Sequence, residues 1–172
     1  MNEKIKTFIQ WGAVGNLAHL VVAALHIYMG TENTILITLN LLLVSIAWFA
    51  VGYKIGGKSL QYKETDYLLF GLICILPMLI YIIAAQSMQW LSESLTIMQN
   101  FNLFYFIGAP TLFWSGPFYP IMNLFPESNI YIQMNINLIL IMFIVFLGGY
   151  LGKSRKIYLK RKKKRQMKEQ NR

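Results

Sequence analysis

The chain has 172 residues, of which 56% are hydrophobic and only 13% charged, and its mean hydropathy is +0.46. Soluble domains carry about 25% charged residues, so this composition excludes an ordinary soluble domain and predicts an all-α integral membrane protein. The formal net charge of +9 is concentrated in short segments between apolar runs. Cys74 is the only cysteine, which excludes an intramolecular disulfide.

Four apolar runs have the length expected of transmembrane helices, since an α-helix needs about 20 apolar residues to cross the hydrocarbon core. They cover residues 8–29, 35–53, 67–85 and 130–151. The first run is too long for a secretory signal and lacks a small-residue cleavage site, so we expect it to be retained as a helix. Together the runs define a polytopic membrane domain over residues 1–152.

Small and polar residues form one seam on the first predicted helix. Their 4, 3, 4, 3, 4 spacing places them on one helix face. The seam consists of Gly12, Asn16, His19, Ala23, His26 and Gly30. Small residues let helix backbones approach, and polar residues hydrogen-bond to neighbouring helices. We therefore select Asn16, His19 and His26, with Asn40 on the second helix, as candidate polar-seam or substrate contacts.

The two histidines of this seam have two interpretations. Neutral imidazoles that hydrogen-bond to a carbonyl or to Asn40 would hold neighbouring helices together. The alternative is a proton or metal role, because intramembrane ionisable residues are costly and histidine both titrates and ligates metals. His19 and His26 lie about 10 Å apart along a helix, and no intramembrane Asp or Glu supplies a third ligand. We therefore expect neither a metal nor a cofactor.

The third apolar run contains Cys74 and Pro77. Pro77 predicts a kink, because proline removes a backbone donor within a helix. Cys74 with His19 as its base would make an intramembrane thiol enzyme, yet this apolar run lacks the electropositive surroundings that thiolate formation needs. A buried free cysteine usually behaves as a small hydrophobic residue. We assign no catalytic residue.

Residues 86–129 form an outer segment rich in aromatic residues, proline and glycine. The stretch 103–125 is long enough for a fifth span, but Pro110, Pro117 and Pro120 interrupt any long helix there. We therefore expect four spans, with an interfacial or re-entrant segment between the third and fourth. A short amphipathic helix in the interface is predicted at its start. The apolar residues of that helix are Met88, Leu91, Leu95 and Met98.

An aromatic cluster follows in the same segment. Trp and Tyr favour the headgroup level of a bilayer, so the cluster is predicted to anchor the outer end of the bundle. The alternative is a groove for a lipid tail, a hydrophobic peptide or a partner's helix. The candidate groove residues are Tyr105, Phe113, Trp114, Phe118 and Tyr119.

The last apolar run opens with polar residues and ends with glycines. Gln133 and Asn137 share a helix face at i, i+4 spacing and join the candidate polar seam. Gly148 and Gly152 form a GxxxG pair, which permits a close helix crossing within the bundle or between copies. The sequence therefore predicts an internal helix pair or, alternatively, self-association through these two glycines.

The charges predict an orientation. Basic residues lie only before the first run, between the second and third runs, and after the last run. The remaining connections carry only Glu32, Glu93 and Glu127. Short loops rich in Lys and Arg stay on the cytoplasmic side of a membrane, so both termini are predicted to be cytoplasmic.

The polybasic tail, residues 153–172, holds eleven of the sixteen Lys and Arg residues. Each basic residue near an anionic surface contributes about 1 kcal/mol, so we expect the tail to contact an anionic inner leaflet. The lipid contacts are predicted at Lys160, Arg161, Lys162, Lys163, Lys164 and Arg165. We expect no nucleic acid, because Tyr158 is the only aromatic residue of the tail that could stack on bases.

Three classes of function are compatible with these patterns. We favour a non-enzymatic module that binds, assembles, regulates or protects another membrane component, because no catalytic site is evident. A small oligomeric transporter or lipid-handling protein that uses the polar seam is the alternative. An intramembrane enzyme that uses Cys74 is the third. Frequent Ile, Lys and Asn indicate a bacterial source, with the chain in the plasma membrane.

Overall fold

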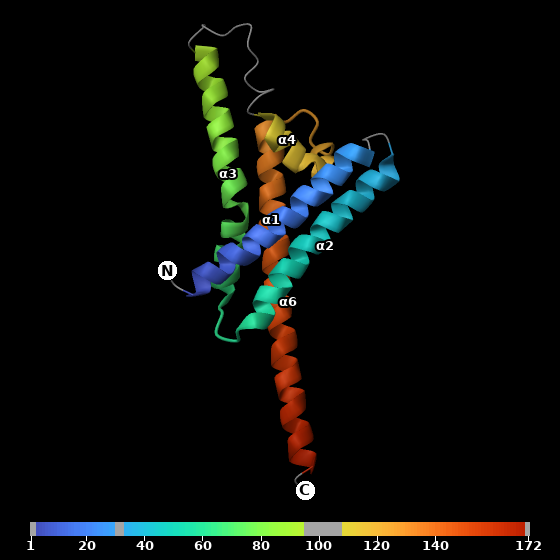
Figure 1. Cartoon of the computed structure of the whole chain (residues 1–172), viewed down its shortest axis with the longest axis vertical. Helices are drawn as coiled ribbons and strands as arrows, with labels where there is room; N and C mark the ends of the chain where they lie inside the picture. The colour runs from blue at the N-terminus through green and yellow to red at the C-terminus, as the bar shows by residue number, and fades with distance from the viewer. Residues whose placement is uncertain (1–2, 30–32, 95–107, 171–172) are drawn as a thin grey trace.

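The computed structural model describes residues 3–29, 33–94 and 108–170, and every regular element in these ranges is helical (Figure 1). In chain order the elements are α1 (Glu3–Met29), α2 (Thr34–Lys58), α3 (Glu64–Ser94), α4 (Ala109–Ser115), the 3₁₀ helix η2 (Gly116–Phe118), α5 (Tyr119–Met122) and α6 (Ile130–Gln170). The all-α prediction is confirmed for this part of the chain.

Four of these helices, α1, α2, α3 and α6, are long and apolar enough to cross a membrane. Each contains one of the four predicted spans, so the predicted number of long apolar helices is confirmed for the described ranges. Their outward faces carry large exposed apolar side chains, including Leu17, Val21, Ile46, Ile80 and Ile139. Soluble proteins expose such side chains only in small patches, so a lipid bilayer is the medium that suits this surface.

The most extensive helix contact joins α2 and α6, which are far apart in the sequence. Glycines on both helices bring the two backbones together. A Cβ atom on Gly56 would overlap the carbonyl oxygen of Gly149, and one on Gly152 would overlap the carbonyl oxygen of Tyr53. Gly148 likewise faces the backbone of α2. The predicted close crossing at the GxxxG pair therefore occurs within one chain.

α3 is longer than the sequence predicted. The structure continues it without interruption to Ser94, because residues 86–94 contain no glycine or proline that would end the helix. The Tyr131 hydroxyl at the start of α6 donates a 2.7 Å hydrogen bond to Gln89 Oε1 on this extension. The predicted separate interfacial helix is therefore wrong as far as Ser94, and the rest of it lies outside the described residues.

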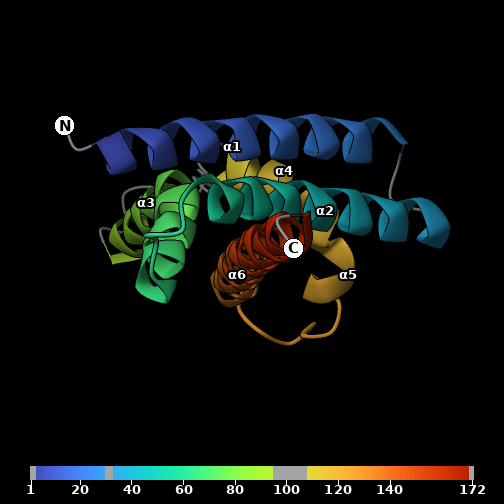
Figure 2. The same cartoon turned by 90° about the horizontal axis from the view of Figure 1, so that it is seen from below.

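The short helices α4, η2 and α5 form what we call the proline segment, residues 108–122. Pro110, Pro117 and Pro120 each stand in the first two positions of one of these helices, where a missing backbone N–H is tolerated. The prolines therefore begin three successive short helices instead of interrupting a long one. The segment packs against α1, α2 and α6, and Figure 2 shows α5 beside α6, with α4 toward α1.

The basic residues that precede residue 157 all lie at one end of the bundle, which we call the basic end. It contains the start of α1, the end of α2, the start of α3 and the point where α6 leaves the bundle (Figure 1). Polar contacts join these elements. They are Lys4 Nζ to Asp66 Oδ1, Lys153 Nζ to the Tyr62 carbonyl, Arg155 to the Tyr53 hydroxyl and Lys156 Nζ to the Lys58 carbonyl. The basic end is therefore tied together across all four long helices.

The polybasic tail is a helical continuation of α6. α6 runs as one helix of 41 residues to Gln170 and extends well beyond the other helices in Figure 1. After Gly152 the sequence has no glycine or proline, so nothing in it ends the helix. All described side chains from Tyr158 onward are exposed.

Candidate functional site

The interior of the bundle is organised around His19 of α1, whose side chain is completely buried. Trp48 of α2 donates its indole N–H to His19 Nδ1 at 3.0 Å. His19 Nε2 lies 2.6 Å from the backbone carbonyl oxygen of Trp114 in α4. Because Nδ1 accepts a hydrogen bond and a carbonyl oxygen can only accept one, the imidazole proton must be on Nε2. The geometry therefore specifies a neutral imidazole with both nitrogens hydrogen-bonded.

Aromatic rings enclose the same imidazole. The Trp114 ring stacks on it with centroids 4.0 Å apart and planes within 7°. Phe118 packs at 5.7 Å and Trp48 at 6.1 Å between ring centroids. We call His19, Trp48 and Trp114 the histidine centre. A metal or a transferred proton would have to displace one of its two hydrogen bonds, so the arrangement favours the interpretation in which His19 holds helices together.

His26, the second histidine of the seam, joins the same neighbours nearer the end of α1. Its Nδ1 lies 3.4 Å from Asn40 Nδ2 on α2. Its ring also packs against Gly116, where a Cβ atom would approach His26 Cδ2 to 2.9 Å. The predicted pairing of a seam histidine with Asn40 therefore involves His26. Both histidines fix the position of the proline segment.

Asn16 contacts α3 instead. Its amide nitrogen donates to the carbonyls of Gly12 at 3.0 Å and of Cys74 at 2.9 Å. Pro77 has no backbone N–H for the carbonyl of Ile73, four residues before it, and its ring disturbs this turn of α3, to which Cys74 also belongs. Asn16 thus supplies a donor from a neighbouring helix. The single seam on α1 serves three different neighbours: α3, α2 and the proline segment.

The two polar residues selected on α6 do not join this seam in the described part of the chain. Gln133 Nε2 donates to the Phe125 carbonyl at 2.7 Å and to the Ser128 carbonyl at 3.3 Å, so it holds the turn that precedes α6. Asn137 is completely buried, and neither end of its amide has a hydrogen-bond partner among the described residues. Neither residue is therefore hydrogen-bonded to the histidine centre in the described part of the chain.

The residues predicted to form an outer groove occupy different environments. Trp114 and Phe118 are buried and pack on His19, whereas Phe113 is half-buried and Tyr119 is exposed. Tyr105 lies outside the described residues. Trp114 and Phe118 of the proline segment therefore face the interior of the bundle. Because Trp114 and Phe118 contact a histidine, they contribute more to the core than to an interfacial surface.

A groove opens between α1 and α3, with a volume of about 470 Å³. We call it the lateral groove, and the two helices that form it cross in Figure 1. Its lining is apolar apart from Asn16 and the indole of Trp114. The lining residues are Ile9, Gly12, Ala13, Asn16, Leu20, Ile73, Leu76, Pro77, Met78 and Trp114. The groove is therefore bounded at one side by a member of the histidine centre.

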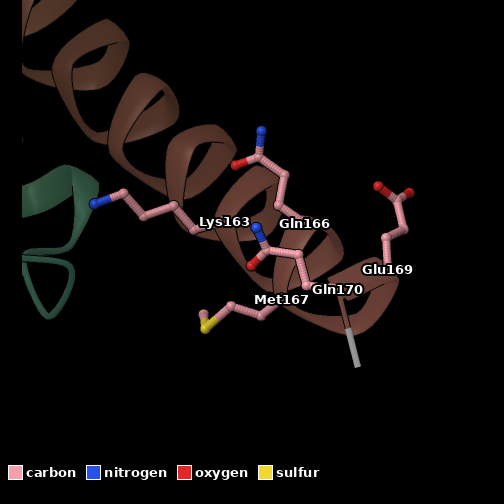
Figure 3. A pocket seen from close by; sticks show the side chains of 5 residues that line it. All are labelled: Lys163, Gln166, Met167, Glu169 and Gln170. Atoms are coloured by element: carbon pink, nitrogen blue, oxygen red, sulfur yellow. The ribbon is translucent and has the colours of Figure 1, made fainter. Parts of the chain in front are cut away.

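A second hollow, of about 560 Å³, lies on the polybasic tail. Lys163, Gln166, Met167, Glu169 and Gln170 line it, and all five belong to the last turns of α6 (Figure 3). One isolated helix cannot enclose a ligand. Despite its larger volume, this hollow is a space between exposed side chains, and the lateral groove is the better candidate for a binding site.

The contacts do not assemble a thiol-enzyme site. Cys74 is buried, and its sulfur faces Gly12 across the α1–α3 contact. Both nitrogens of His19 are already hydrogen-bonded, one to the Trp48 indole and the other to the Trp114 carbonyl. The imidazole therefore has no free nitrogen to act as a base for this thiol. The described residues also contain no group of three His, Cys, Asp or Glu side chains that could hold a metal ion.

Sequence reasoning missed Trp48, which donates the hydrogen bond that fixes the His19 tautomer. A signal was present. Trp48 continues a stripe of buried residues on α2 that includes Asn40, Val44 and Val51, and it lies far from the ends of that helix, where membrane tryptophans usually gather. A tryptophan in mid-span and a histidine in mid-span on adjacent helices are potential donor and acceptor.

The fold and the site together define a small bundle of four membrane-length helices, built around a buried histidine–tryptophan centre and bearing a lateral groove. No family model, curated protein or solved structure matches the chain.

Proposed function

We propose that this chain is a non-enzymatic, multi-pass membrane protein whose lateral groove binds an apolar chain of a membrane lipid. The groove itself carries the proposal. Its volume of about 470 Å³ falls within the range of roughly 300–1,000 Å³ that is usual for small-molecule sites. Its lining comes almost wholly from aliphatic side chains of the two helices, which suits a flexible hydrocarbon ligand.

The position of the groove favours lipid over a partner's helix. It lies between α1 and α3, whose outward faces are apolar along their length, so a ligand would enter sideways from the hydrocarbon. A partner's helix is about 10–12 Å across with its side chains and suits a broad face. A recess lined by ten residues, with an indole among them, suits a single chain better.

The non-enzymatic assignment follows from where the polar groups are used. His19, His26 and Asn16 each form hydrogen bonds that join α1 to its neighbours. A general base or nucleophile needs a free lone pair directed at a substrate. In the described chain these side chains instead stabilise the bundle, and the binding surface beside them is apolar.

We further propose that the basic end faces the cytoplasm and that both termini lie there, in the plasma membrane of a bacterium. The last turns of α2 and the connection that follows carry Lys54, Lys58 and Lys63, and positively charged segments between spans are retained on that side. On this arrangement the proline segment enters the bundle from the opposite side. The His19 contact with the Trp114 carbonyl then lies within the membrane.

Filling the groove tests the lipid proposal. Ala13→Trp adds an indole to the groove lining, whereas Ala24→Trp places the same side chain at an exposed position of α1 outside it. We expect Ala13→Trp to lower labelling of the groove by a lipid with a photoreactive mid-chain group roughly tenfold, equivalent to about 1.4 kcal/mol. Ala24→Trp should leave labelling unchanged. The readout is mass spectrometry of the full-length protein in liposomes.

Two results would count against lipid in the groove. Equal labelling of wild type and Ala13→Trp within the groove would show that the lipid does not occupy the lateral groove. Loss of a co-purifying membrane protein from Ala13→Trp, with lipid labelling unchanged, would make a partner's helix the occupant.

Side-specific cysteine labelling tests the orientation. In a Cys74→Ala background, single cysteines at Lys58, Glu127 and Lys168 occupy exposed positions at the two ends of the bundle. In intact cells we expect Glu127→Cys to react with a membrane-impermeant thiol reagent added from outside. Lys58→Cys and Lys168→Cys should react only after the membrane is opened. Reaction of Glu127→Cys and Lys168→Cys from the same side would overturn the proposed orientation.

A further inference from the structure

The polybasic tail leaves the bundle in a direction fixed at its base. Arg155 donates to the Tyr53 hydroxyl at 2.8 Å, and Lys156 Nζ donates to the Lys58 carbonyl at 2.8 Å. Lys153 Nζ donates to the Tyr62 carbonyl at 2.6 Å. These bonds connect the first turn of the tail to the end of α2 and the following loop. The remaining turns therefore continue along the axis of α6, away from the other helices (Figure 1).

Positive charge surrounds this helix. Six consecutive basic residues, 160–165, cover more than one full turn at 3.6 residues per turn, and all six are exposed. Tyr158, Leu159 and Met167 lie on different sides of the helix at this periodicity, so the tail has no apolar face. Figure 3 shows Lys163 and Glu169 extending from opposite sides of the last turns. An interfacial membrane helix needs one apolar face and one polar face, and this helix lacks the apolar one.

Distance also separates the outer charges from the bilayer. Arg165 lies nine residues beyond Lys156, about 14 Å along the helix, and Lys168 lies about 18 Å beyond it. The Debye length at physiological ionic strength is about 8 Å. Lipid headgroups near the base of the tail are therefore screened from the residues at its tip. A partner for those residues has to approach the tail from the aqueous side.

We propose that residues 160–168 of the tail bind the phosphate backbone of a nucleic acid duplex. A duplex groove carries phosphates on both sides, so it neutralises a helix that is basic all round. An acidic protein face would contact only one side of it. Like charges spaced three and four residues apart also destabilise a free helix, and bound phosphates relieve that repulsion. Because phosphate contacts require no base stacking, the scarcity of aromatic residues does not oppose duplex binding.

Salt-dependent binding by the full-length protein is the test. The protein is placed in nanodiscs of zwitterionic lipid, and binding of a fluorescent RNA duplex is measured by anisotropy over a series of salt concentrations. Each neutralised phosphate adds about −0.9 to the slope of log K against log salt, so six contacts predict a slope near −5. Lys162→Gln with Lys163→Gln should reduce the magnitude of the slope by about 2. The matched pair Lys6→Gln with Lys54→Gln, exposed but on the bundle, should leave it unchanged.

Each other outcome overturns the proposal or identifies the source of the phosphate. Equal effects of the two double variants would overturn the proposal, because RNA binding would then depend on positive charge anywhere on the protein surface and not on the tail. Loss of RNA binding when the nanodiscs contain anionic lipid would place the tail on the bilayer. Polyglutamate that binds as tightly as RNA at equal charge would make an acidic protein the partner. DNA and RNA duplexes of one sequence are compared in parallel, and binding of either supports the proposal.

Discussion

Alanine at Gly56 is expected to destabilise the protein by about 3 kcal/mol, which is the upper part of the usual range for overpacking. The added methyl group would overlap the carbonyl oxygen of Gly149. A backbone atom of a packed helix cannot move aside as the end of a flexible side chain can. The strain would fall on the contact between α2 and α6, the most extensive helix contact in the structure. Unfolding of the purified protein in mixed micelles, titrated with SDS, measures the loss.

The adjacent glycine provides a matched control. A Cβ atom at Gly57 would meet nothing within 4 Å, although Gly57 lies on the same helix one residue further on. Alanine is favoured over glycine in a helix by up to about 1 kcal/mol, so Gly57→Ala should be neutral or slightly stabilising. Equal destabilisation by the two variants would show that the effect comes from α2 alone and not from its crossing with α6.

His19→Ala is expected to lower the free energy of unfolding by about 2–4 kcal/mol. The substitution removes a completely buried ring and leaves the Trp48 indole N–H and the Trp114 carbonyl without their partner. Both groups are buried, so water does not readily replace the lost bonds. The same SDS titration measures the change. Release of the proline segment from α1 should appear as faster proteolysis near Trp114.

His19→Phe separates the hydrogen bonds from the packing. Phenylalanine keeps a flat ring that can stack on Trp114, but it accepts no hydrogen bond from Trp48. We therefore expect a smaller loss, about 1–2 kcal/mol. Lipid binding in the groove should persist in this variant, since His19 does not line it. Full stability of His19→Ala, together with loss of a proton or substrate flux in liposomes, would contradict the structural role and support a transporter.

The sequence contained enough information for the helices and for much of their packing. Apolar length predicts α1, α2, α3 and α6, because only about 20 apolar residues are needed to recognise a span. The prolines at 110, 117 and 120 correctly exclude one long helix over the described residues 108–122. The GxxxG pair predicts a close crossing of α6, although spacing alone does not say that its partner is α2.

The histidine centre was less predictable because its parts come from distant segments. The spacing of His19 on α1 places it on an interior face, but its acceptor is a backbone carbonyl, and every residue has one. Nothing in the sequence distinguishes the carbonyl of Trp114 from the others. The end of α3 was missed for another reason. Polarity increases after residue 85, yet glutamine, serine and methionine continue a helix once it has formed.

The hydrogen bond between His19 and the Trp114 carbonyl joins residues 95 positions apart, and the glycines of α2 meet α6 across a similar interval. During synthesis the hairpin of α1 and α2 therefore emerges well before either partner exists. Until residue 114 has been made, His19 Nε2 lacks the carbonyl to which it is hydrogen-bonded in the complete bundle. α1 and α2, which end at Lys58, thus form an incomplete intermediate until the proline segment and the last helix have been made.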